Sequence, residues 1–222
     1  MNLTVAKTSA NGPDLNYDYQ QSHGINFEVV KPLRFNENWS GVGKLLLFHN
    51  QAPMGNYALA NANFTGIPDL SSTHQGLRTK DGFSFNAELS YRDLIGFFSR
   101  YSWNDGKNET WAFTEIDEAV SFGMHIWGKN WNRSKDYVGL AWVRNGLSKS
   151  HQQFQALGGN GFMIGDGNLN YGGEHILEMF YQLSIPGNQF FISPDYQLVV
   201  NPGYNKDRGP VHVFSLRVHT EF

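Results

Sequence analysis

The feature of this 222-residue chain that most constrains its fold is an alternation of large apolar residues with small or polar ones. Successive side chains of a β-strand point to opposite faces, so the pattern gives a strand one apolar and one polar face. Such a strand suits a membrane barrel, with lipid outside and a lumen inside, or a soluble β-sandwich. In the clearest segment, Val120, Phe122, Met124 and Ile126 share one face, and Ala119, Ser121, Gly123 and His125 share the other.

About ten segments show this pattern, and each is close to the length of a tilted membrane-spanning strand. The chain has no run of about 18 apolar residues, so it contains no candidate transmembrane helix. The predicted strands lie near residues 2–8, 23–32, 41–50, 82–91, 94–104, 117–128, 136–146, 174–184, 189–200 and 210–222.

The connections between these segments alternate in length. Long loops at one end of the strands and tight turns at the other are typical of outer-membrane barrels, whereas a Greek-key sandwich does not sort its loops in this way. We therefore predict an all-β fold, a transmembrane antiparallel up-and-down β-barrel, as a single domain over residues 1–222. Long connections are expected near 9–22, 51–81, 105–116, 147–173 and 201–209, and short ones near 33–40, 92–93, 129–135 and 185–188.

The composition agrees with this fold and excludes several functions. Charged residues make up 17% of the chain and aromatic residues 15%, a mixture that suits an apolar outer band, aromatic girdles and a polar lumen. The net charge of −3 provides no basic footprint for nucleic acid. Because cysteine is absent, the chain has no disulfide, thiol nucleophile or cysteine-ligated metal.

Several charged residues fall on the polar side of their strands. A lysine or arginine that faced lipid at mid-depth would cost about 2–4 kcal/mol. The alternation of the strands and this energetic cost therefore both predict that these residues face the lumen. Acidic and basic groups opposed across a pore suit a neutral polyhydroxylated solute and give little net preference for ions. The alternative is structural, with paired charges that only fill a narrow lumen. The lumen-facing candidates are Glu28, Lys44, Glu88, Arg100, Glu178 and Arg217.

Aromatic residues occur near the ends of the predicted strands, where amphipathic rings meet the headgroup region of a membrane. We expect most of them to form interfacial girdles. The alternatives are rings that stack on sugars in the lumen and ordinary core packing. The set comprises Tyr101, Trp103, Trp111, Trp127, Trp131, Tyr137 and Trp142.

The chain ends on an alternating strand whose last residue is Phe222. Barrel proteins of bacterial outer membranes commonly end on Phe, and the barrel assembly machinery recognises the last strand by adding it to a sheet edge. We therefore interpret Phe222 as an assembly signal; the alternative is a chance terminal residue. At the other end, the residues after Met1 show no basic and apolar export signal.

Motifs for catalysis or metal binding are weak. The eight histidines form no HExxH pattern or close pair, and no nucleophile elbow supports the alternative of an outer-membrane hydrolase. Residues 166–170 (DGNLN) begin like a calcium loop, but the glycine and the closing glutamate are not in register, so a turn is the simpler interpretation. We expect no enzyme activity, cofactor or metal.

From about Thr79 to Phe222 the chain resembles the C-terminal half of the carbohydrate-selective porin (OprB) family. Residues 1–78 are less similar, although 54–60 (MGNYALA) resembles a short loop helix found there. The resemblance implies passive diffusion of neutral sugars across the lipid of the bacterial outer membrane, without a cofactor. It supplies no catalytic residue, and we carry no binding residue over from it. The segments that carry the resemblance are 98–106 (FSRYSWNDG), 112–117 (AFTEID), 143–148 (VRNGLS), 165–172 (GDGNLNYG) and 201–211 (NPGYNKDRGPV).

Members of this family are similar to barrels of about 16 strands and are about twice as long as this chain. About ten strands would close only a narrow barrel, and an unclosed sheet would expose an edge that lipid does not tolerate. We therefore expect the chain to form the C-terminal part of a larger porin barrel. The alternatives to a conducting porin are a non-conducting structural barrel and a truncated, non-functional fragment. Homo-oligomeric assembly is expected only by analogy with other porins.

Overall fold

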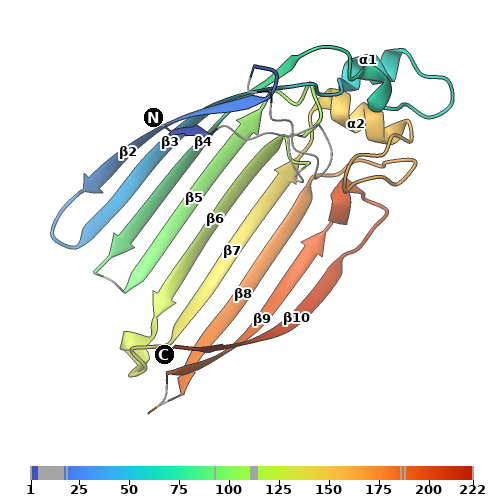
Figure 1. The fold of residues 1–222 in the computed structure, drawn as a ribbon. Coiled ribbons are helices and arrows are strands. Elements are labelled where there is room, and N and C mark those ends of the chain that lie inside the picture. The colour runs from blue at the N-terminus through green and yellow to red at the C-terminus, as the bar shows by residue number, and fades with distance from the viewer. Residues whose placement is uncertain are drawn as a thin grey trace.

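The computed structural model describes residues 2–4, 18, 20–92, 94–110, 115–185, 187 and 189–221. Its strands form one ten-stranded antiparallel sheet in chain order (Figure 1). The strands are β1 (Asn2–Thr4), β2 (His23–Arg34), β3 (Trp39–Ala52), β4 (Arg78–Tyr91), β5 (Ile95–Asn104), β6 (Glu118–Trp127), β7 (Tyr137–Gly146), β8 (Glu174–Ile185), β9 (Phe190–Val200) and β10 (Val211–Thr220). The connections contain α1 (Tyr57–Ala62), α2 (Lys149–Ala156) and the 3-10 turns η1 (Ser71–Thr73), η2 (Gly128–Trp131) and η3 (Pro202–Tyr204).

Each predicted strand corresponds to a strand of this sheet, so the all-β antiparallel prediction is confirmed. Strands β2 to β4 are longer than predicted because their polar ends continue the ladder: Arg34 still pairs with Ser40, and Arg78 with Ala52. Residues 5–8 of the first predicted strand lie outside the described residues.

The alternation of connection lengths is also confirmed. The described long connections all lie at one end of the strands and the short ones at the other, and Figure 1 shows α1 and α2 together at the long-connection end. The long connections are 53–77, 105–117, 147–173 and 201–210, and the short ones are 35–38, 92–94, 128–136 and 186–189.

The two helices differ in how well the sequence revealed them. Helix α1 falls where the family resemblance placed a loop helix, and it begins after Asn56, whose side chain accepts a hydrogen bond from the Leu59 N–H at 2.9 Å. Helix α2 was not predicted, because it is short and polar and lies within a long loop. Its one local signal is Ser148, which caps the helix by accepting from the His151 N–H at 3.2 Å.

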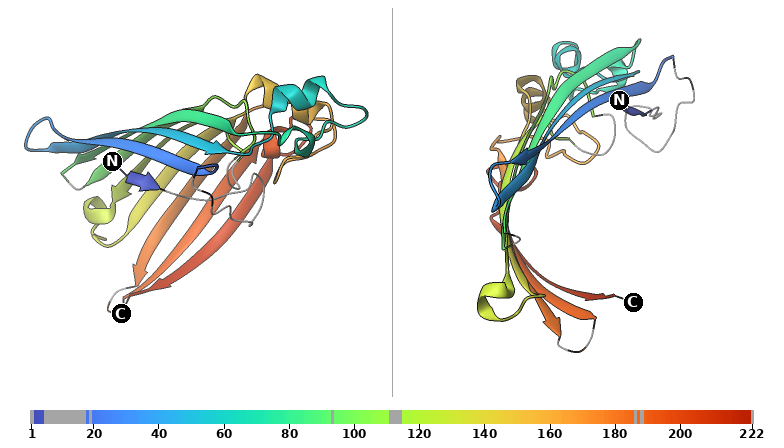
Figure 2. Two further views of the ribbon diagram at one scale, coloured as in Figure 1. Left: turned by 45° about the horizontal axis from the view of Figure 1, so that its top comes forward. Right: turned by 90° about the vertical axis from the view of Figure 1, so that its left-hand side faces the viewer.

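The sheet curls into an open trough, with the N-terminal strands at one rim and β10 at the other (Figure 2). Among the described residues, β10 pairs with β9 alone and no ladder joins it to β1. The ten strands therefore form a partial barrel, and the sheet does not close.

One face of the sheet is apolar and exposed. Directly opposed cross-strand residues share a face, so the register assigns every strand residue to one of the two faces of the sheet. No helix among the described residues is long and apolar enough to cross a membrane. The apolar face carries Phe27, Val29, Leu45, Leu47, Phe85, Phe97, Trp103, Phe122, Leu177, Met179, Phe214, Leu216 and Val218, all exposed. A continuous apolar surface of this size suits contact with lipid.

This apolar face is the convex side of the trough. Tyr181 lies on it, as the cross-strand partner of Val138, and its hydroxyl donates to Asp136 in the 128–136 connection. Figure 2 shows that connection standing out from the convex side of the curved sheet. The opposite face is therefore the concave one, and the two are called the convex face and the concave face below.

Candidate functional site

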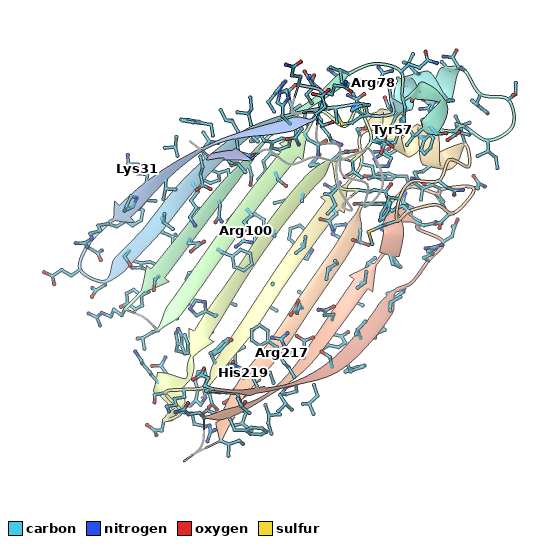
Figure 3. All side chains as sticks on the ribbon, in the orientation of Figure 1. Lys31, Tyr57, Arg78, Arg100, Arg217 and His219 are labelled. Carbon is cyan, nitrogen blue, oxygen red and sulfur yellow. The ribbon has the colours of Figure 1, made fainter. Side chains whose placement is uncertain are left out.

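The register places all six charged residues singled out by parity on the concave face. Lys44, Asn86 and Arg100 follow one another in a cross-strand row. Glu88 belongs to the neighbouring row, which runs from it through β5, β6 and β7 to Glu178. Glu28 opposes Leu46 in β3, which shares its face with Lys44, and Arg217 opposes Ser193 in β9. Figure 3 shows Arg100 near the middle of the sheet and Arg217 toward the short-turn end.

These charges are only loosely paired in the first half of the sheet. Lys44 Nζ lies 3.9 Å from Glu88 Oε1, and the two side chains are 35% and 45% exposed. An ion pair this long and exposed contributes little to stability. The Arg100 guanidinium lies 5.3 Å from the centre of the Phe98 ring. Neither cation is therefore held in a short ion pair with a described residue.

A second polar group lies on β8 to β10, and sequence reasoning missed one of its members. Glu178 Oε2 accepts from Gln197 Nε2 at 3.1 Å. Asp195 is 8% exposed and accepts from Ser215 Oγ at 3.3 Å. Parity could have identified Asp195, because it alternates in phase with Gln197 along the same predicted strand. The six predicted residues thus form separate polar groups along one face and are not a single cluster.

Aromatic rings of the concave face lie flat against the sheet, over glycines of the next strand. A Cβ atom at Gly123 would lie 2.3 Å from Phe98 Cε1, and one at Gly139 would lie 2.2 Å from Phe180 Cε1. Phe98 opposes Gly123, and Phe180 opposes Gly139, in the register. An aromatic ring that covers a cross-strand glycine is a known stabilising arrangement in sheets. Here it also keeps the rings close to the wall.

The concave face contains two adjacent hollows, which share Phe98 and His125. The first, of about 450 Å³, lies beside Glu88 and Arg100. The second, of about 380 Å³, lies toward the short-turn end and is lined by Trp127, Tyr137, Gly139, Phe180 and Glu178, among others. Together they make a path along the face, with Glu88 and Arg100 in the first hollow and Glu178 beside the aromatic rings of the second.

Girdle positions were expected for most of the seven aromatic residues, and three of the seven lie elsewhere. Trp127 and Tyr137 oppose each other on the concave face, in phase with His125, and their ring centres lie 4.9 Å apart. Trp142 is on the convex face but in the middle of β7, opposite Phe122. Proximity to a strand end was an insufficient criterion, because it does not consider the face of the sheet to which the alternation assigns each ring. Tyr101 and Trp103 lie on the convex face of β5, Trp131 lies in η2, and Trp111 lies outside the described residues.

Buried polar contacts hold the long connections together in what we call the loop cap, formed by 53–77, 105–117, 147–173 and 201–210. Glu115 Oε2 accepts from the Met163 and Ile164 N–H groups at 2.7 and 2.8 Å. Asp117 Oδ2 lies 2.9 Å from His151 Nδ1, and the His151 ring stacks on a further cap residue, Tyr57, at 4.1 Å. The cap is therefore a fixed structure at the long-connection end of the trough.

Electrostatics differ between two buried carboxylates of the loop cap. Burial alone would raise the pKa of Asp117, but the hydrogen bond and charge of His151, helped by Lys80, hold that pKa below its usual value. Burial raises the pKa of Glu109 although the Gly55 N–H and His74 favour its charged form. Asp117 is thus stabilised as an anion, whereas Glu109 is penalised as one.

The remaining sequence candidates occupy structural positions or lie outside the description. Asp166, of the incomplete calcium loop, accepts hydrogen bonds from Asn205 and Arg208. Within the described ranges no three His, Asp or Glu side chains are grouped so as to hold a metal ion. Phe222 lies outside the described residues, so the assembly signal stays a prediction.

A family model described as "Carbohydrate-selective porin, OprB family" matches residues 2–222. The match thus includes the N-terminal third, which the motifs alone left less similar. No curated protein matches the chain.

Proposed function

The chain belongs to the carbohydrate-selective porin family OprB, and from this premise we propose that it admits neutral sugars by passive diffusion across the bacterial outer membrane. One observation carries the proposal: the six predicted charges share the concave face, whereas most of the exposed large apolar residues of the strands lie on the convex face. That division matches a lumen on one side and lipid on the other. A family of channels also argues for transport rather than catalysis.

The charges of the concave face favour a neutral solute. Acidic and basic residues are interspersed along it, from Glu28 and Lys44 near one rim to Glu178 and Arg217 near the other. No single sign of charge extends along the whole wall to attract one kind of ion. Sugar hydroxyls, which both donate and accept hydrogen bonds, can pair with either kind of group.

The flat aromatic rings provide the other half of a sugar-compatible surface. Phe98 and Phe180 cover glycines, so they present ring faces to the concave space without projecting far into it. A pyranose has an apolar C–H face that packs against such rings, while its rim of hydroxyls remains available for hydrogen bonds. We propose the path from Glu88 to Phe180 as the solute-facing surface.

The open trough requires more wall than these ten strands supply. In lipid, the unpaired backbone groups of β10 would have no partner. We propose that the trough forms the C-terminal part of a larger porin barrel, which further strands or another chain complete. Contact with outer-membrane lipid, recognition by the barrel assembly machinery and assembly into homo-oligomers belong to the same proposal.

Flux measurements on the full chain in lipid vesicles test this function. We expect vesicles that contain the chain assembled into a closed barrel to swell faster in glucose than in gluconate or glucosamine, which are matched anionic and cationic solutes. The double variant Phe98→Ala and Phe180→Ala should lower glucose flux relative to wild type. Phe122→Ala, on the convex face, is the control and should leave flux unchanged.

A folded, heat-resistant chain that gives no flux above empty vesicles would contradict the proposal and favour a non-conducting structural barrel. Absence of any folded band would show that the ten strands act only within a larger barrel. Equal flux of the three solutes would contradict the preference for neutral sugars while leaving a general pore.

A further inference from the structure

The connection 128–136 is the longest of the short turns, and it is fastened to the convex face. Its Asp136 accepts from the Tyr181 hydroxyl at 2.6 Å and from the Ser184 N–H at 2.9 Å. Arg133 donates to Asp136 and, at 2.6 Å, to the Ser184 carbonyl. Trp131 Nε1 donates to the same Tyr181 hydroxyl at 3.1 Å. These contacts fix the position of the turn beside the C-terminal end of β8.

The turn carries excess positive charge. Arg133 is neutralised by Asp136, whereas Lys129 and Lys135 are exposed, and neither takes part in an ion pair of the described residues. A polar hollow of about 210 Å³ is lined by Lys135, Arg133 and the neighbouring turn residues. Two unpaired lysines beside a membrane-facing surface attract anionic headgroups.

An apolar groove lies on the convex face next to this turn. Its volume is about 380 Å³, and its apolar lining includes Val138, Met179, Tyr181, Tyr196 and Phe214. Tyr181 belongs to both places: its ring lines the groove and its hydroxyl is held by the turn. The apolar groove and the cationic turn are therefore adjacent parts of one surface.

The groove coincides with a gap in the β8–β9 ladder. The β8–β9 ladder pairs Phe180 with Asp195 and Leu183 with Ile192, and it omits the two positions between them. Pro194 occupies one of those positions, and proline has no N–H to donate to a ladder. The interruption lies beneath the groove, whose lining includes Pro194 itself.

We propose that the groove and the turn together bind one anionic phospholipid, with an acyl chain in the groove and the phosphate on Lys129 and Lys135. The inference rests on the proposed membrane location, in which the short turns face the periplasmic side and so reach the phospholipid leaflet. An isolated cationic turn would bind any anion, and an isolated groove any alkyl chain. Their connection through Tyr181 selects a ligand that has both parts.

Lipid binding to the full chain in detergent micelles tests the proposal, with phosphatidylglycerol and phosphatidylcholine as probes and native mass spectrometry as readout. We expect tighter binding of phosphatidylglycerol. The double variant Lys129→Gln and Lys135→Gln should lower that preference about twenty-five-fold, since each lysine near an anionic surface contributes roughly a factor of five. Val138→Phe, which fills the groove, should weaken binding of both lipids.

The matched control is Lys107→Gln with Lys149→Gln, which removes the same charge from exposed positions at the long-connection end. An equal loss of preference in this control would attribute the effect to net charge and overturn the proposal. Equal binding of both lipids to wild type, or full displacement of the lipid by inorganic phosphate, would overturn it as well. Because the assay needs no conduction, failure of sugar flux with intact lipid preference would refute only the porin function.

Discussion

Removal of the Glu115 side chain tests whether the loop cap is held by a single buried carboxylate. Glu115 is 5% exposed, and its Oε2 accepts two backbone hydrogen bonds from the far side of the 147–173 connection. A hydrogen bond to a charged group contributes about 1.5–3 kcal/mol, so Glu115→Ala should destabilise this contact by roughly 3–6 kcal/mol. The loss should be local, because the ladders of the sheet do not involve this side chain.

Hydrogen exchange is the direct assay. A loss of about 3 kcal/mol corresponds to roughly 150-fold faster exchange, and it should appear at the amides of Met163 and Ile164 while peptides from β4 to β9 stay protected. Glu115→Gln keeps one acceptor and should give a smaller effect. Glu37→Ala, an exposed carboxylate in a short turn, is the control and should change nothing in the cap.

Two results would refute the reasoning. If the two amides exchange in Glu115→Ala as slowly as in wild type, the cap is held by other contacts, such as the packing of Tyr57 on Phe154. If exchange accelerates throughout the sheet, the cap and the strands unfold as one unit, and the cap is not a separate structure.

Three further predictions concern the trough itself and the acid side of the cap. Gly139→Ala should lift Phe180 from the wall, cost about 1 kcal/mol, at the low end of overpacking, and reduce disaccharide flux more than monosaccharide flux; adding Phe180→Ala should remove this difference between the two sugars. Phe122→Lys should cost about 2–4 kcal/mol in urea titrations of the lipid-embedded chain, whereas Ser121→Lys on the concave face should cost far less. The pKa of Asp117 is lower in the folded chain than in the unfolded one. Its charged form therefore stabilises the cap above the unfolded-state pKa of about 3.9, and this stabilisation is lost as pH falls through the folded-state pKa. Asp117→Asn should accordingly weaken the pH dependence of hydrogen exchange in the cap at acidic pH.

The sequence predicted the sheet well because a side-chain period of two leaves little freedom. A shift of one residue would move every apolar side chain of a strand to the other face, so parity in 119–128 already assigned Phe122 and Ser121 to opposite sides. The same rule assigned Arg100 and Glu178 to one face before any register was known. The same rule would have placed Trp127 on the face of His125, two residues earlier in the strand, but the girdle prediction considered only its position near the strand end.

The loop cap could not be predicted in the same way. Its contacts join residues far apart in the sequence, such as Glu115 with Ile164 and Tyr204 with the Glu115 carbonyl. No periodic signal marks such pairs, because each depends on where a loop returns. The convex-face groove escaped prediction for a related reason: Pro194 lies within the continuous strand β9, as expected, and only the β8–β9 ladder omits its position.

The distribution of buried residues decides what stabilises this chain. Its apolar clusters lie in the loop cap, for example Tyr57 with Phe154 and Leu147 with Tyr204, rather than behind the sheet. The convex face has no second layer among the described residues, and all of β10 is exposed. In water such a sheet would leave most of its large apolar side chains hydrated, so packing within the chain cannot be its main source of stability. Contact of the convex face with lipid and completion of the barrel by further strands, both proposed above, would supply the rest.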